Sequence, residues 1–180
     1  MRKNAVRKLA LIACAAIAAA ALVGIAGAAT PGTLDVVEGK GTVTIEIKGN
    51  ILGVLANGSV RVTDLTPRDR FYPAVFGRRL NVTRIGPKTV LYKGRSLRYR
   101  LLGGSSRIVI KGTGISVSAT GRGHTILDGD RNFPEDDAGV YSLEGADCVL
   151  DVTLCVPLPD LPERHLIGTP KSTTRSSQAR

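Results

Sequence analysis

The sequence is poor in the residue types with which proteins bind bases and sugars or build catalytic centres. It has no tryptophan, three phenylalanines and four tyrosines, so aromatic side chains on which a base could stack are scarce. It has two histidines, His124 and His165, and neither a Gly-X-Ser-X-Gly nucleophile elbow nor a spacing of zinc ligands. These absences disfavour nucleic acid as a partner and leave few groups for catalysis.

The first 29 residues contain no acidic residue and have the order of an export signal. A basic head precedes an uncharged run, Leu9 to Ile25, which ends in the small residues 26–28 (Ala-Gly-Ala). This order predicts a helical signal peptide over residues 1–28, cleaved before Ala29 and used by the Sec pathway. The alternative is an uncleaved anchor, since Leu9 to Ala29 approaches the roughly 20 residues that span a bilayer.

Cysteine is also scarce. Cys14 would leave with the signal peptide, so Cys148 and Cys155 would be the two that remain. Two cysteines seven residues apart in an exported β domain predict a disulfide. A Cys-His hydrolase would instead pair one of them with His124, but neither cysteine stands in a known nucleophile signature.

No amphipathic helix is visible after the signal, and the hydrophobic pattern has the period of two residues that is typical of strands. Residues 41–48 are the clearest case, because Val43, Ile45 and Ile47 alternate with polar residues. Glycine-containing turn signals recur at intervals of roughly 8 to 12 residues, the spacing of sandwiches and barrels. The predicted fold is therefore all-β, an antiparallel meander over residues 33–156 that forms a small sandwich or barrel.

The strongest turn signal is Asn57-Gly58, because both residues tolerate the positive φ angles of a type I′ hairpin turn. A β-solenoid remains the alternative, since the Gly-X-Gly triplets at 112 and 121 repeat after nine residues and small residues would occupy matching corners of its coils. Residues 157–180 begin rich in proline and end in Ser, Thr, Arg and Gln. We expect this tail to be extended and then disordered.

The turn triplets and the stretch Val75-Phe-Gly-Arg-Arg79 give the chain a resemblance to a group of bacterial proteins. Between Gly39 and Gly129 it resembles glycine-rich exported β proteins that bacteria of high genomic G+C encode in numbers and that have no assigned activity. The resemblance implies an exported bacterial β domain. It assigns no catalytic or binding role to any residue of this chain.

The charge of the chain is divided between two segments. Residues 61–122 hold 14 basic residues against Asp64 and Asp69, and residues 123–163 hold ten acidic residues against Arg131. If strand alternation points the basic side chains outward, one face carries the candidate polyanion-binding residues Lys93, Arg95, Arg98, Arg100, Arg107 and Lys111. The alternative is that the acidic segment lies beside the basic one and neutralises it within the fold.

The acidic loop 128–137 begins with the pattern Asp-X-Asp-X-Asn of a calcium loop. An EF-hand is excluded, because Phe133 stands where that motif requires glycine and Gly139 where it requires glutamate. A looser calcium site would use Asp128, Asp130, Asn132 and Asp136. Asp128 and Asp130 could also act as an acid and base pair on a glycan, and both are ordinary turn residues.

These patterns together predict an exported, non-enzymatic β module of the cell envelope or the medium, with a structural or binding role. Its basic face would bind an anionic cell-wall polymer or an anionic lipid surface. The alternative is a small envelope hydrolase that uses the loop 128–137. The hydrolase needs Asp128 or Asp130 in a cleft, whereas the binding module needs its arginines on an exposed face.

Overall fold

The computed structural model of the chain describes residues 30–66, 73–134, 137–143 and 145–169. The predicted signal peptide lies outside these residues. The described part is all-β and antiparallel, as predicted, and includes the short 3-10 turn η2 (Val152–Leu154). No helix in the described part is long and apolar enough to cross a membrane.

Four long strands form most of the unit that extends from Ala29 to Pro170. They are β1 (Gly32–Asp64), β2 (Ala74–Gly86), β3 (Thr89–Leu101) and β4 (Ser105–Gly129). Three short strands follow, namely β5 (Val140–Ser142), β6 (Val156–Pro157) and β7 (Glu163–Ile167). The strands lie in the order β2-β3-β1-β4-β7, and β5 pairs with β1 and β6.

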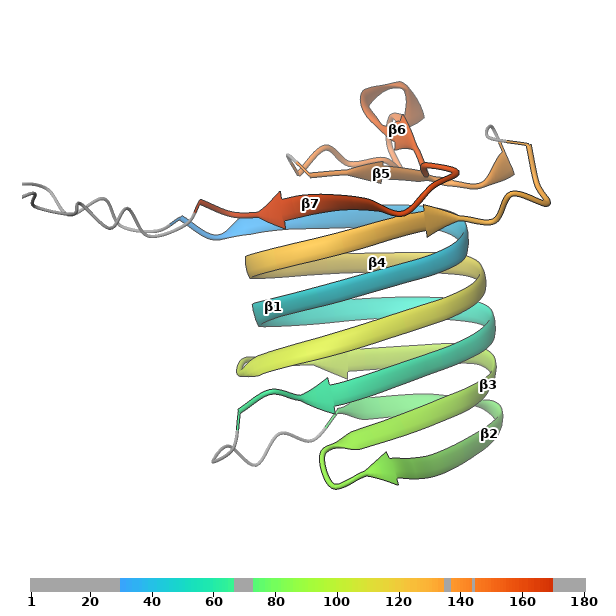
Figure 1. Cartoon of the computed structure of the whole chain (residues 1–180). Coiled ribbons are helices and arrows are strands. Elements are labelled where there is room, and N and C mark those ends of the chain that lie inside the picture. The colour runs from blue at the N-terminus through green and yellow to red at the C-terminus, as the bar shows by residue number, and fades with distance from the viewer. Residues whose placement is uncertain (1–29, 67–72, 135–136, 144, 170–180) are drawn as a thin grey trace, which may run out of the picture. The chain divides into compact units, whose positions relative to one another are not determined.

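β1 and β4 wind round a common axis as a coiled antiparallel ribbon (Figure 1). The winding is visible in the pairing, because single residues have register partners on both sides that lie far apart in sequence. Thr42 of β1 pairs with both Lys111 and Asp128 of β4, and Ala119 of β4 pairs with both Leu34 and Ile51 of β1. The sheet does not close on itself, and β2 and β7 are the edge strands at the two ends of its main strand order.

Glycines stack in columns where the ribbon bends. One column runs across the sheet through Gly129, Gly41, Gly112, Gly58 and Gly94, each paired with the next. A Cβ at Gly58 would lie 2.1 Å from the Lys111 carbonyl oxygen, and one at Gly112 would lie 2.0 Å from that of Asn57. Both glycines also have φ near +150°, at +147° and +150°. Side chains are therefore excluded at this corner by space and by backbone conformation.

The hairpin predicted at Asn57-Gly58 is wrong, because both residues lie inside β1 and pair with β3 and β4. Positive φ at a glycine suits a tight turn and a strand corner equally well. The neighbouring strands decide between the two here, since Gly58 faces Gly94 on one side and Gly112 on the other. The predicted meander of short strands is thus replaced by a few long, bent ones.

The glycine corners repeat along both long strands. Gly41 and Gly58 of β1 are 17 positions apart (58 minus 41), and so are Gly112 and Gly129 of β4 (129 minus 112). One winding of the ribbon therefore takes 17 residues. The fold combines the antiparallel pairing that was predicted with the small residues at matching corners that were expected of the solenoid alternative.

The inward faces of the coils form the hydrophobic core. Val43, Ile45 and Ile47 are buried, which confirms the alternation predicted for residues 41–48. The segment that holds β5 and β6 covers one end and adds Ala138, Tyr141 and Leu158 to the core cluster. Burying one large aliphatic side chain stabilises a fold by about 1.5–3 kcal/mol. Burial of these residues in the stacked coils is therefore sufficient to drive folding.

The structure differs from the predicted domain boundary at residue 156. β7 lies within residues 157–180, the predicted tail, and pairs with residues 123–127 of β4. Ile167 of this strand is buried in the core. None of the prolines of this segment lies within β7, so they do not prevent residues 163–167 from satisfying backbone groups at the edge of β4.

Candidate functional site

All six predicted polyanion-binding residues are exposed on the outside of the coil. β3 carries Lys93, Arg95, Arg98 and Arg100, and β4 carries Arg107 and Lys111. Leu97, Tyr99 and Leu101, which alternate with Arg98 and Arg100, are buried. The alternation of residues 97–101 thus places Arg98 and Arg100 outside, as the sequence predicted.

The two residues on β4 do not belong with those on β3. Arg107 forms an ion pair with Glu46, whose Oε2 lies 2.6 Å from Nη2 and 2.7 Å from Nε of the arginine. Lys111 lines a hollow of about 600 Å³ together with Asp128 and Asp130, so here the basic and acidic segments meet. Glu46 is an acidic neighbour of Arg107, and the two aspartates are acidic neighbours of Lys111. Their negative charges lower the affinity of Arg107 and of Lys111 for an anion.

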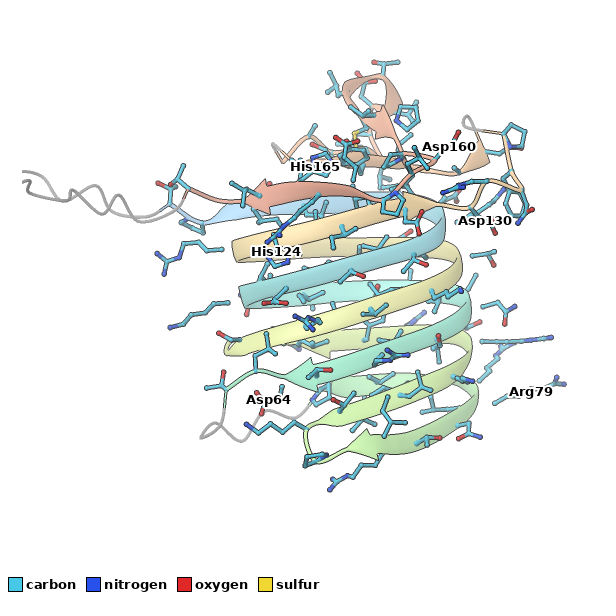
Figure 2. The ribbon with its side chains drawn as sticks, viewed as in Figure 1. Asp64, Arg79, His124, Asp130, Asp160 and His165 are labelled. Carbon is cyan, nitrogen blue, oxygen red and sulfur yellow. A yellow bond between two sulfur atoms is a disulfide. The ribbon has the colours of Figure 1, made fainter. Side chains whose placement is uncertain are left out.

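β2 supplies basic residues that the sequence prediction did not include. It pairs with β3 and adds Arg78, Arg79 and Arg84, all exposed. Arg78 lies opposite Arg95 in the register, and Figure 2 shows Arg79 pointing away from the coil. The Arg78-Arg79 pair was visible in the sequence, but its pairing with β3 depends on the fold.

The β2–β3 hairpin, residues 74–101, is therefore strongly basic. It holds eight basic residues and no acidic one. We define the basic surface as the six of these that lie at or near the register partners Arg78 and Arg95, namely Arg78, Arg79, Lys93, Arg95, Arg98 and Arg100. β2 and β3 lie at one end of the sheet order, and β1 and β4 separate them from β7. The neutralisation alternative requires the acidic segment, residues 123–163, to lie beside the basic residues. In this strand order it does not lie beside the basic surface.

Apolar residues and a hollow adjoin the basic surface. Leu52 and Val54 of β1 lie opposite Arg100 and Arg98, and both are exposed on the outer face. A hollow of about 460 Å³ is lined by Val54, Arg98 and Ser116, and also by the charged residues Glu38 and Lys40. A ligand bound at Arg98 and Arg100 would also contact the uncharged side chains of Leu52 and Val54.

Arg79 and Ser96 have left-handed backbone angles, φ +51° and +49°, although neither is glycine. Both lie where the β2–β3 register is irregular, close to the Arg78–Arg95 pair. Such conformations are uncommon for residues with a Cβ and are frequent where side chains are aimed for function. These irregularities turn the hairpin round the corner that glycines form in β1 and β4.

The acidic loop forms part of the 600 Å³ hollow, which is lined by Asp128, Asp130 and Asn132 and by Arg131. Asp130 Oδ1 accepts hydrogen bonds from the Asn132 backbone N at 3.1 Å and from its Nδ2 at 2.7 Å, so this carboxylate closes a turn. Asp136 lies outside the described residues. Within the described part no group of three or more His, Cys, Asp or Glu could hold a metal ion, and the calcium site stays a prediction.

The predicted disulfide is confirmed, since Cys148 and Cys155 are joined with an S–S distance of 2.00 Å. No thiolate is then left at these positions for a Cys-His mechanism. His165 Nε2 lies 3.4 Å from the Tyr141 hydroxyl, a contact that joins β7 to β5, and 3.6 Å from Glu163 Oε1 within β7. Burial raises the pKa of Tyr141, and the negative charge of Glu163 adds to this shift.

Comparison with known proteins gives no match to a family model, to a curated protein or to a solved structure. The function must therefore be inferred from the surface of the molecule itself. The exposed arginines fulfil the requirement of a binding module. Asp128 and Asp130 also lie in a hollow, as a hydrolase would require, but Asp130 is engaged in the turn.

Proposed function

We propose that this protein is an exported, non-enzymatic module that binds an anionic polymer of the cell envelope through the basic surface of its β2–β3 hairpin. The observation that carries the proposal is the presence of eight exposed basic residues, and no acidic one, on residues 74–101. Each added like charge raises the energy of the others. A binding partner of opposite charge relieves that repulsion.

The residue types and their surroundings favour a phosphate-bearing polymer. Six of the eight basic residues are arginines, whose planar donors bind phosphate oxygens in pairs. Leu52 and Val54, which lie opposite Arg100 and Arg98, offer uncharged contacts for the units between phosphates. A lipid headgroup would use the arginines alone, so we favour the polymer over a membrane surface.

The test is co-sedimentation of the exported protein with purified cell wall, at low and high salt, beside a tube without wall material. Binding should weaken steeply with salt, because each neutralised phosphate releases a counterion. The double variant Arg98→Glu, Arg100→Glu should remain folded, because both side chains are exposed, and should bind weakly. By analogy with single-stranded nucleic acid, its logarithmic salt slope should fall by about 1.4, or about 0.7 per lost phosphate contact.

A matched control makes the same change in net charge elsewhere. Lys48→Glu, Arg164→Glu alters two exposed residues of β1 and β7, outside the basic surface. This variant should sediment with cell wall nearly as well as the wild type. Equal loss in both variants would mean that net charge alone drives binding, and retention of the Arg98, Arg100 variant would remove the basic surface from the mechanism. Binding to anionic vesicles but not to wall would point to lipid instead.

A further inference from the structure

The loop closed by the disulfide exposes much apolar surface. Val149 is 78% exposed and Leu150 is 84% exposed. Further exposed apolar residues in or beside this loop are Val152, Leu154, Val156 and Leu161. The Asp147 carboxylate accepts hydrogen bonds from the backbone N of Val149 at 3.0 Å and of Leu150 at 3.2 Å. The disulfide and these bonds hold the loop in one shape, and exposed apolar groups of this kind mark interaction sites.

A second incomplete surface lies on β2. This strand is an edge of the sheet and pairs with β3 on one side. Within the described part of the chain no strand pairs with its other side, so the backbone groups there are available to another chain, as at an edge strand. Val82 and Ile85 are about half exposed, at 54% and 49%, and Arg84 lies between them. The edge is thus apolar and basic.

The loop, by contrast, belongs to an acidic part of the molecule. Residues 137–163, which we name the acidic cap, contain six acidic residues and no basic one. Asp147, Asp151 and Asp160 of the cap are exposed. In Figure 1 the cap, with β5 and β6, lies at the opposite end of the coil from β2, and Figure 2 shows Asp160 and Arg79 at these two ends.

These charges decide which surfaces of two copies attract each other. Two acidic caps repel, and two β2 edges repel, so a twofold contact of either end with itself is disfavoured. A cap and a β2 edge have opposite charge, and each exposes apolar side chains that the other would cover. Since both ends are on every copy, the favoured contact is head to tail.

We propose that copies of this protein associate head to tail, with the disulfide loop of one acidic cap seated on the β2 edge of the next copy. The occupant of the β2 edge is thus a second copy of this chain. Such a contact uses different surfaces on the two partners, so it forms a ring if the rotation closes and an open filament if it does not. The inference does not depend on polymer binding by the basic surface.

The test begins with sedimentation velocity of the exported protein over a range of concentrations. Species larger than a monomer should grow with concentration at low salt and decline at high salt. Three double variants follow, each with two exposed apolar residues replaced by aspartate. They are a loop variant (Val149→Asp, Leu150→Asp), an edge variant (Val82→Asp, Ile85→Asp) and a control from the middle of the sheet (Leu52→Asp, Val54→Asp). Thermal melting checks that each is folded.

The loop and edge variants should each lower the association constant by more than about tenfold, as loss of a central apolar contact does. The control should have the association constant of the wild type, whatever its effect on polymer binding. A mixture of the loop and edge variants should form one-to-one dimers and nothing larger, because each retains the surface that the other has lost. The proposal is overturned if the wild type stays monomeric at all concentrations. It is also overturned if the mixture stays monomeric, or if association requires the loop and not the edge.

Discussion

Replacing Gly112 by alanine should severely destabilise the protein. The new Cβ would lie 2.0 Å from the carbonyl oxygen of Asn57, well inside the distance at which a carbon and an oxygen can approach, and φ is +150° at this residue. Both the strand pairing and the backbone would have to shift at a corner where β4 lies between two windings of β1. We expect a loss of more than about 4 kcal/mol, a range reached only by severe packing or backbone defects. For a domain of this size that corresponds to a fall in melting temperature of at least about 8 °C.

Alanine substitutions at two other glycines separate the stability cost of a steric clash from the cost of a left-handed backbone conformation. Gly103 has φ +68° but open space where a Cβ would stand, so Gly103→Ala should cost about 1–2 kcal/mol through backbone strain alone. Gly86 has ordinary contacts, the nearest at 3.7 Å, so Gly86→Ala should change stability by less than about 1 kcal/mol. The assay is thermal and urea unfolding of all three variants. If Gly112→Ala were no less stable than Gly103→Ala, close packing of the glycine columns would not be what shapes the coil.

Two further predictions concern the interior and the disulfide. The Tyr99 hydroxyl is buried without a hydrogen-bond partner among the described residues, so Tyr99→Phe should raise stability by about 1 kcal/mol; a loss would reveal a bound partner such as water. Burial also raises the pKa of Tyr99. The unfolded chain therefore loses this proton first above about pH 10, stability falls as pH rises further, and Tyr99→Phe should reduce that fall in alkaline unfolding curves. Replacing Cys148 and Cys155 by serine should lower stability by about 2 kcal/mol, and thiol labelling of unfolded wild type without reductant should detect no free thiol at these positions.

Local sequence was sufficient to predict the features that depend on neighbouring residues alone. The alternation of Val43, Ile45 and Ile47 with polar residues predicts a strand with one buried face, because only a period of two places all three on one side. In the same way Arg98 and Arg100 had to be exposed once Leu97, Tyr99 and Leu101 were buried. The disulfide followed from two cysteines close in sequence.

The candidate site was predicted only in part, because it depends on which strands become neighbours. Four of the six predicted basic residues share β3, whereas Arg107 is paired with Glu46 and Lys111 lies beside the acidic loop. Arg78 and Arg79 join the site through the pairing of β2 with β3. No property of the local sequence around 78 and 95 shows that these positions are register partners.

The sequence by itself determined that this is an all-β chain with alternating inward residues, a divided charge and a short disulfide loop. Only the tertiary structure decided that the glycines are corners of a coil and not the turns of a meander. The physical reason is that positive φ is equally compatible with both, and the choice depends on the strands alongside. Gly58 became a corner because Gly94 and Gly112, 36 and 54 positions further along the chain (94 minus 58; 112 minus 58), pack against it without side chains.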